Sequence, residues 1–161
     1  MAKGKKLGLI INPRAGIGGS VGLKGSDGEA IQQQALALGA IPRAQERTIE
    51  ALKQLVAVKD VVELMTYPAE MGAAAAFACG FMPWVIGSIQ AGRTTGEDTV
   101  RAAREMAEAG VDLLLFTGGD GTARDIYRAI AMDIPVLGIP PPHFWEAKPV
   151  TCHCHGYPCA R

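Results

Sequence analysis

Five short apolar segments alternate along this chain with segments in which apolar residues recur every three or four positions. An apolar run bounded by Gly, Pro or polar residues is typical of a buried strand, and a three-to-four repeat is typical of a helix. We therefore predict strands over residues 7–11, 61–66, 81–86, 111–116 and 135–139.

Helix start and stop signals lie between these strands. The spacing of a capping box fits Ser26 with Glu29, and either Thr95 with Asp98 or Thr94 with Glu97. Helices are predicted over about residues 26–38, 49–58, 69–78, 95–109 and 121–132. Strands that alternate with helices predict an α/β fold of three layers, in which helices cover both faces of a parallel, Rossmann-like sheet. Such sheets bind ligands beyond the carboxyl ends of their strands.

One uncharged stretch, residues 71–92, has the length of a membrane span. It is largely Ala and Gly, which gain little from lipid, and Pro83 interrupts it. We interpret it as an alanine-rich helix followed by a buried strand.

Composition narrows the class of protein. The 161 residues suit one domain, and a hydrophobic content of 48% is ample for a core. Lys and Arg (16) balance Asp and Glu (16), so no global charge recruits nucleic acid or an anionic membrane. The apolar run after the basic start is too short for a signal peptide, which predicts a cytoplasmic protein.

The sequence Thr117-Gly118-Gly119-Asp120-Gly121-Thr122 carries the strongest functional signal. It joins a buried strand to a helix start, where backbone N–H groups and the helix dipole favour a phosphate. Glycines let a phosphate approach the backbone, and Asp120 adds one carboxylate. The alternative is a purely structural strand–helix turn, in which Thr122 and Asp125 form a capping box.

A second glycine-rich turn follows the first strand and runs from Asn12 to Gly25. It does not fit GxGxxG, because Val21 takes the last position, and it does not fit the P-loop, because Leu23 precedes Lys24. Asn12, Arg14 and Lys24 offer polar groups for a nucleotide pocket. The alternative is a flexible surface loop.

The two turns together resemble those of the superfamily of NAD kinases and diacylglycerol or sphingosine kinases. The resemblance covers about residues 5–140 and rests on Asn12-Pro13-x-x-Gly16 followed by Gly118-Gly119-Asp120-Gly121-Thr122. The ATP-NAD kinase-like branch is similar in three longer strings, at residues 11–19, 21–28 and 95–99.

The resemblance implies phosphoryl transfer from ATP, with Mg²⁺, to the 2′-hydroxyl of NAD, which gives NADP. Asp120 would be the catalytic residue that orients or deprotonates this hydroxyl. The nucleotide-binding residues implied by the match are Asn12, Gly16, Gly118, Gly119, Gly121 and Thr122. The expected partners are small-molecule nucleotides. Family members often assemble, and a bare sheet edge would favour a homo-oligomer.

The resemblance ends near Pro140. Members of this family carry a second, mostly β domain that supplies much of the NAD site, and nothing in residues 141–161 matches it. We expect residues 1–140 to form the family's N-terminal domain and residues 141–161 to be an irregular tail rich in Cys, His and Pro. Two interpretations of the tail stay open: a zinc site, although Cys152-His153-Cys154 is tight for one, and an unselected, out-of-frame segment.

Three functions therefore remain as hypotheses. The first is an NAD kinase-like enzyme, or the nucleotide-binding half of one. The second is a non-catalytic nucleotide-binding module. The third is a relative of the lipid kinases, which the lack of a basic amphipathic helix in the sequence disfavours.

Overall fold

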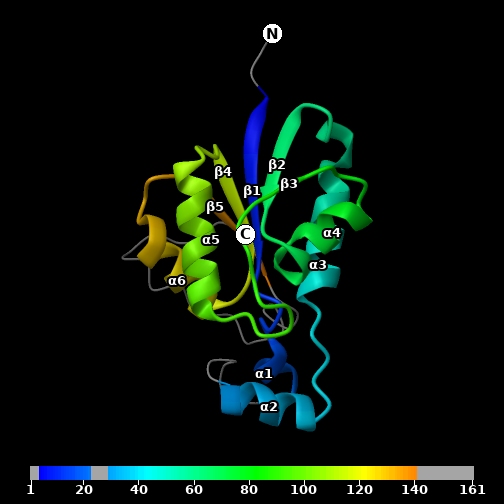
Figure 1. The fold of residues 1–161 in the computed structure, drawn as a ribbon. Coiled ribbons are helices and arrows are strands. Elements are labelled where there is room, and N and C mark those ends of the chain that lie inside the picture. The colour runs from blue at the N-terminus through cyan, green and yellow to red at the C-terminus, as the bar shows by residue number, and fades with distance from the viewer. Residues whose placement is uncertain (1–3, 23–28, 141–161) are drawn as a thin grey trace, which may run out of the picture.

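In the part of the chain that the structure describes, five parallel strands form one central sheet (Figure 1). The structure, a computed structural model, describes residues 4–22 and 29–140. The strand order is β3-β2-β1-β4-β5, and every neighbouring pair is parallel. The strands are β1 (Lys5–Ile11), β2 (Val62–Thr66), β3 (Trp84–Val85), β4 (Leu113–Thr117) and β5 (Val136–Ile139).

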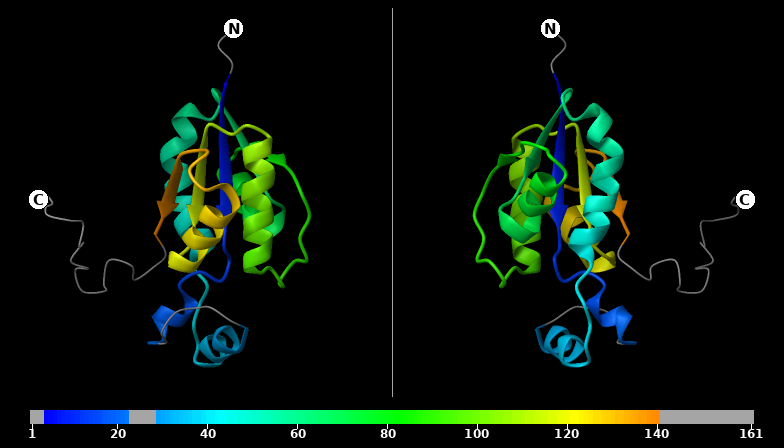
Figure 2. Two further views of the ribbon diagram at one scale, coloured as in Figure 1. Left: turned by 90° about the vertical axis from the view of Figure 1, so that its left-hand side faces the viewer. Right: turned by 90° about the vertical axis from the view of Figure 1, so that its right-hand side faces the viewer.

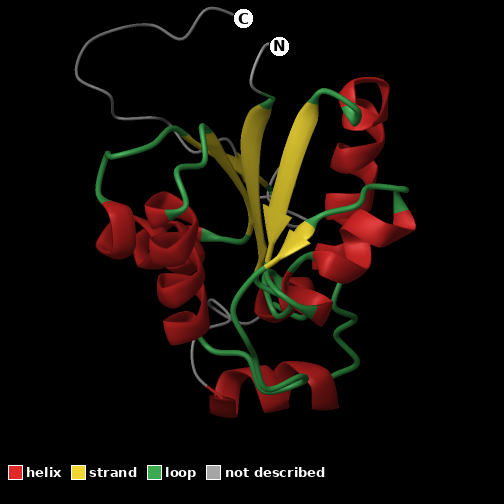
Figure 3. Ribbon diagram, turned by 45° about the horizontal axis from the view of Figure 1, so that its top comes forward, coloured by secondary structure: helices red, strands yellow, loops and turns green. Residues whose placement is uncertain are grey.

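Helices cover both faces of this sheet and complete three layers, which Figure 3 shows with the helices in red and the strands in yellow. One face carries α3 (Ala44–Leu55) and α4 (Ala73–Ala78), and the other carries α5 (Gly96–Glu108) and α6 (Asp120–Ile130). The remaining helical elements are α1 (Ile17–Ser20), α2 (Glu29–Ala37), η1 (Val56–Val58) and η2 (Ala69–Met71). The predicted α/β architecture is confirmed.

The core consists of two layers because successive side chains of the central strand point to opposite faces. Leu9 and Ile11 of β1 pack with Ala44 and Leu52 of α3. Ile10 packs on the other face, with side chains of α5 and α6. Each of the fully buried Leu and Ile side chains contributes roughly 1.5–3 kcal/mol of burial free energy.

The predicted start of α5 is confirmed in detail. Thr95 precedes the helix and forms a capping box with Asp98, whose carboxylate accepts the Thr95 N–H at 2.8 Å. Gly110, with φ of 73°, follows the end of the helix, as a left-handed glycine commonly does. Thr95 with Asp98, rather than Thr94 with Glu97, is therefore the pair that starts this helix.

The strand predicted over residues 81–86 is wrong in extent and in burial. β3 comprises Trp84 and Val85 alone, at the edge of the sheet, and both side chains are exposed. Pro83 immediately precedes it and has no N–H for a ladder hydrogen bond. Phe81 is buried, but its N–H bonds the Ala76 carbonyl at the end of α4 rather than a strand.

Two helix predictions also need correction. The alanine-rich segment over 69–78 is broken at Gly72 into η2 and α4, because Gly72 has φ of 148° and the Thr66 hydroxyl occupies the place of its Cβ. The helix predicted to begin at residue 49 begins at Ala44. Its buried side chains Ala44, Thr48 and Leu52 follow one another at four-residue spacing, which is one face of a helix.

The helices α1 and α2 lie outside the three layers, beyond the carboxyl end of the sheet (Figures 1 and 2). They share a small cluster of buried residues, Ile17, Ala35 and Ala40. The glycine-rich turn after β1 therefore contains a short helix rather than loop alone. Lys24 and the Cys/His-rich tail, residues 141–161, lie outside the described residues. The predicted capping box of Ser26 with Glu29 lies partly outside them, because Ser26 is not described.

No helix within residues 4–22 and 29–140 is long and apolar enough to cross a membrane. Much of the uncharged stretch is buried against the sheet: Ala75, Ala76 and Phe81 belong to the core cluster on the α3 face.

Candidate functional site

The two glycine-rich turns meet where the strand order reverses. β1 and β4 are neighbours, and the chain leaves β1 toward β2 and β3 before it returns to β4 and β5. The Asn12 N–H donates to the Thr117 carbonyl at 2.9 Å, so the backbones stay paired to the last residue of β4. In open α/β sheets, the crevice at this switch point is the usual place for a ligand.

Adjacent glycines in the second turn have different surroundings. A Cβ on Gly118 would lie 2.3 Å from the Thr122 Cβ, so the fold itself requires glycine there. A Cβ on Gly119 would meet nothing within 4 Å, and its φ of −95° suits any residue. The space in front of Gly119 is therefore open at the start of α6.

The helix after this turn begins earlier than predicted. Gly119 is the N-cap of α6 and makes no side-chain cap, while Asp120 and Gly121 are its first two residues. The capping box of Thr122 with Asp125 is therefore wrong as the start of this helix. The Thr122 hydroxyl instead accepts a hydrogen bond of 2.9 Å from the Asn12 side-chain amide.

Both polar atoms of the Asn12 side chain form hydrogen bonds. Its Oδ1 accepts the Arg14 N–H at 3.1 Å, and its Nδ2 reaches Thr122. The Asn12 carbonyl accepts the Ala15 N–H at 3.0 Å, which closes a turn. Gly16 follows with φ of 76° and leads into α1. The seven residues predicted for the site therefore lie in the two segments that follow β1 and β4, and the hydrogen bond from Asn12 to Thr122 joins these segments.

Arg14 connects the cap formed by α1 and α2 to the sheet. Its guanidinium donates to the Gln32 side chain of α2 at 2.5 Å and to the Gly92 carbonyl at 2.8 Å. The Gly92 N–H in turn donates to the Glu70 carboxylate at 2.5 Å. Hydrogen bonds therefore link the turns that follow β1, β2 and β3 along the carboxyl edge of the sheet.

The charge at the glycine turn comes from one carboxylate and one helix terminus. Asp120 is exposed and is the first residue of α6. The unpaired N–H groups of a first helical turn and the helix dipole favour a bound anion. Within the described ranges, no three His, Cys, Asp or Glu side chains gather as a metal site.

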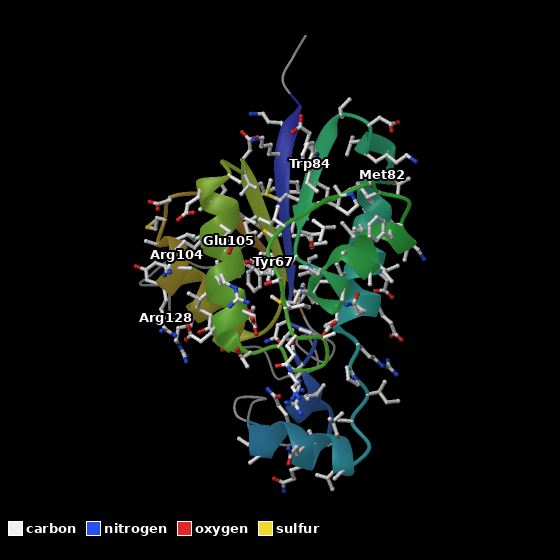
Figure 4. All side chains as sticks on the ribbon, in the orientation of Figure 1. Tyr67, Met82, Trp84, Arg104, Glu105 and Arg128 are labelled. Carbon is white, nitrogen blue, oxygen red and sulfur yellow. The ribbon has the colours of Figure 1, made fainter. Side chains whose placement is uncertain are left out.

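Tyr67, which follows β2, is the largest fully buried side chain among the described residues. Figure 4 labels it beside Glu105 of α5. Burial, together with the Glu105 carboxylate, raises the pKa of the Tyr67 hydroxyl to about 12. Arg101 and Glu105 lie near this hydroxyl, but no hydrogen bond of ordinary geometry joins it to a described residue.

The sequence patterns did not single out a buried pair of threonines behind the glycine turn. The hydroxyl oxygens of Thr48 (α3) and Thr117 (β4) are 2.6 Å apart, and both side chains are fully buried. A signal was present for Thr48, because it occupies the middle of the apolar stripe Ala44–Thr48–Leu52 of α3.

The fold and the two turns define a Rossmann-like α/β domain with a glycine-rich turn at the switch point of its sheet. The family model of the ATP-NAD kinase N-terminal domain matches residues 7–143. The chain therefore belongs to the ATP-NAD kinase family, which supports a nucleotide-binding kinase fold. No curated protein sequence and no solved structure matches it.

Proposed function

We propose that this chain binds ATP at the Gly118–Gly121 turn and transfers its γ-phosphoryl group to the 2′-hydroxyl of NAD, giving NADP. The observation that carries the proposal is the open space at Gly119, in front of the first turn of α6. Packing explains glycine at position 118 but not at position 119. A phosphate that approaches the backbone closely would explain it.

The two turns would form the walls of this phosphate site. The N–H groups of the first turn of α6 would donate to phosphate oxygens. The Thr122 hydroxyl accepts the Asn12 amide hydrogen and so keeps its own hydrogen for a phosphate. Gly16 adopts the left-handed conformation that glycine favours, with φ of 76°, and the chain enters α1 directly after it.

Asp120 would act on the acceptor. Its exposed carboxylate would accept a hydrogen bond from the 2′-hydroxyl, orient the oxygen toward the γ-phosphorus and take its proton. A bond then forms from the 2′-oxygen to phosphorus as the bond from phosphorus to the β–γ bridging oxygen breaks, and ADP leaves. Mg²⁺ supplies charge neutralisation when bound with ATP, and Asp120 is the charged ligand that this turn offers.

Incubation of the full chain with ATP, Mg²⁺ and NAD, followed by chromatographic detection of NADP and ADP in equal amounts, tests the proposal. A parallel incubation replaces NAD with vesicles that contain diacylglycerol or sphingosine. NADP formation supports the proposal. ATP binding without any phosphorylated product would identify a nucleotide-binding module instead, and a phosphorylated lipid would identify a lipid kinase relative.

A further inference from the structure

The buried threonine pair forms a directed chain of hydrogen bonds. Thr48 Oγ1 donates to the Ala44 carbonyl at 2.8 Å, so its single hydrogen is already used. The bond of 2.6 Å between the two hydroxyls must then be donated by Thr117 and accepted by Thr48. The last side chain of β4 is thereby fixed to the first turns of α3.

This chain of hydrogen bonds ends next to the glycine turn. Thr117 directly precedes Gly118, and its carbonyl also accepts the Asn12 N–H at 2.9 Å. At the far end of the turn, Thr122 is held by the Asn12 side chain at 2.9 Å. The four residues between Thr117 and Thr122 therefore have restraints on both sides.

We infer that Thr48 is a positioning residue for the phosphate-binding turn, an inference that rests on the function proposed above. Glycines give the turn many accessible conformations, and a site that binds through backbone N–H groups needs one of them fixed in advance. Thr48 supplies this restraint from α3, through its hydrogen bond with the Thr117 hydroxyl. It is 0% exposed, so it acts through Thr117 and not by contact with the nucleotide.

Thr48→Val removes the hydroxyl and keeps the shape of the side chain, while Thr48→Ser keeps the hydroxyl. Calorimetric titration with ATP and Mg²⁺ should show the Kd raised about fivefold in Thr48→Val, the factor that corresponds to one ordinary hydrogen bond. Thr48→Ser should bind within about twofold of wild type. If both variants bind ATP like wild type, or both lose affinity equally, the hydroxyl does not position the turn.

Thr66→Val is the matched control. Thr66 is also fully buried at the carboxyl end of a strand, and its hydroxyl donates to the Leu9 carbonyl at 2.9 Å. Within the described residues, no hydrogen bond joins the Thr66 hydroxyl to the Gly118 turn. Thr66→Val should lose thermal stability much as Thr48→Val does, yet keep the wild-type Kd for ATP. A matching loss of ATP affinity in Thr66→Val would mean that destabilisation alone explains the effect.

The double variant Thr48→Val/Thr117→Val separates the effect on thermal stability from the effect on ATP affinity in a second way. Removal of both partners leaves no buried hydroxyl unpaired, so its melting temperature should recover toward wild type. Its ATP affinity should remain as weak as that of Thr48→Val. Recovery of affinity together with stability would overturn the inference.

Amide hydrogen exchange tests the inference even if the proposed function fails. The Asn12 and Ala123 N–H groups donate to the carbonyls of Thr117 and Gly119, and the Ile86 N–H donates to that of Thr66. In Thr48→Val, the first two amides should exchange at least tenfold faster, while Ile86 keeps its wild-type rate. Unchanged exchange at Asn12 and Ala123 would refute the positioning role. A wild-type chain that binds no ATP would instead refute the proposed function.

Discussion

The side-chain amide of Asn12 donates a hydrogen bond of 2.9 Å to the hydroxyl of Thr122, a residue 110 positions further along the chain. This bond joins the turn after β1 to the first turn of α6. It places both residues, each predicted to contact a nucleotide, in direct contact with one another. Their shared bond fixes the distance between the two walls of the candidate site.

Asn12→Ala and Asn12→Asp should separate the structural part of this bond from its effect on charge. Asn12→Ala leaves the Arg14 N–H and the Thr122 hydroxyl without a partner and should lower the free energy of unfolding by about 1–3 kcal/mol. Asn12→Asp can still accept from both groups, so it should lose less stability. Its added negative charge should nevertheless weaken ATP binding at least as much as Asn12→Ala does.

Urea denaturation and calorimetric ATP titration of both variants check this expectation. An Asn12→Asp protein that binds ATP as tightly as wild type would place the phosphates away from Asn12.

Gly118→Ala should reduce stability, whereas Gly119→Ala should reduce ATP affinity. The new Cβ at position 118 would lie 2.3 Å from the Thr122 Cβ, which cannot move without the backbone of α6. Gly118→Ala should therefore lower the free energy of unfolding by about 1–3 kcal/mol. The Cβ at position 119 meets nothing within 4 Å, so stability should stay within about 0.5 kcal/mol of wild type. Gly119→Ala should nevertheless weaken ATP binding at least tenfold, because its methyl group would occupy the open space.

Thermal melts with and without ATP measure both effects on the same samples. Gly119→Ala protein that ATP stabilises as strongly as it does wild type would show that no phosphate approaches this residue.

Tyr67→Phe should change the dependence of stability on alkaline pH. The folded state raises the pKa of Tyr67 from 10.0 to about 12, so the folded chain holds a proton that the unfolded chain releases. The free energy of unfolding should therefore fall as the pH rises from about 10 to about 12. Tyr67→Phe lacks this component, and near neutral pH it should be about as stable as wild type, because the lost hydroxyl has no hydrogen-bond partner among the described residues.

Urea denaturation of wild type and Tyr67→Phe at several pH values from 8 to 11 gives the difference directly. The stability of Tyr67→Phe relative to wild type should rise over the upper part of this range. A difference that does not vary with pH would mean that the folded state leaves the hydroxyl's titration unchanged.

The strand–helix alternation was readable from the sequence because buried strands carry unbroken apolar runs. The central strand β1 and its neighbour β4 gave the clearest signals, since helices cover both of their faces. The edge strand β3 did not follow this rule. Its apolar residues Trp84 and Val85 are exposed, so an apolar run there did not mean burial.

The candidate site was predictable as a list of residues but not as a set of contacts. Glycine spacing and strand ends placed Asn12 and the Gly118 turn at one edge of the sheet. The bond from Asn12 to Thr122 depends on the order of the strands, which local patterns do not contain. The pairing of Thr48 with Thr117 depends on how α3 packs against β4, which is a tertiary contact between residues 69 positions apart.

Asp120→Asn tests the central claim most directly, with Asp133→Asn, an exposed carboxylate beyond α6, as its control. The measurement is the rate of NADP formation from ATP, Mg²⁺ and NAD, with melting temperature and ATP affinity recorded for each protein. We expect wild type and Asp133→Asn to form NADP. Asp120→Asn should bind ATP and keep the wild-type melting temperature, but its rate of NADP formation should be less than about one hundredth of the wild-type rate. Wild-type turnover in Asp120→Asn, or no NADP from the wild-type chain, would contradict the account.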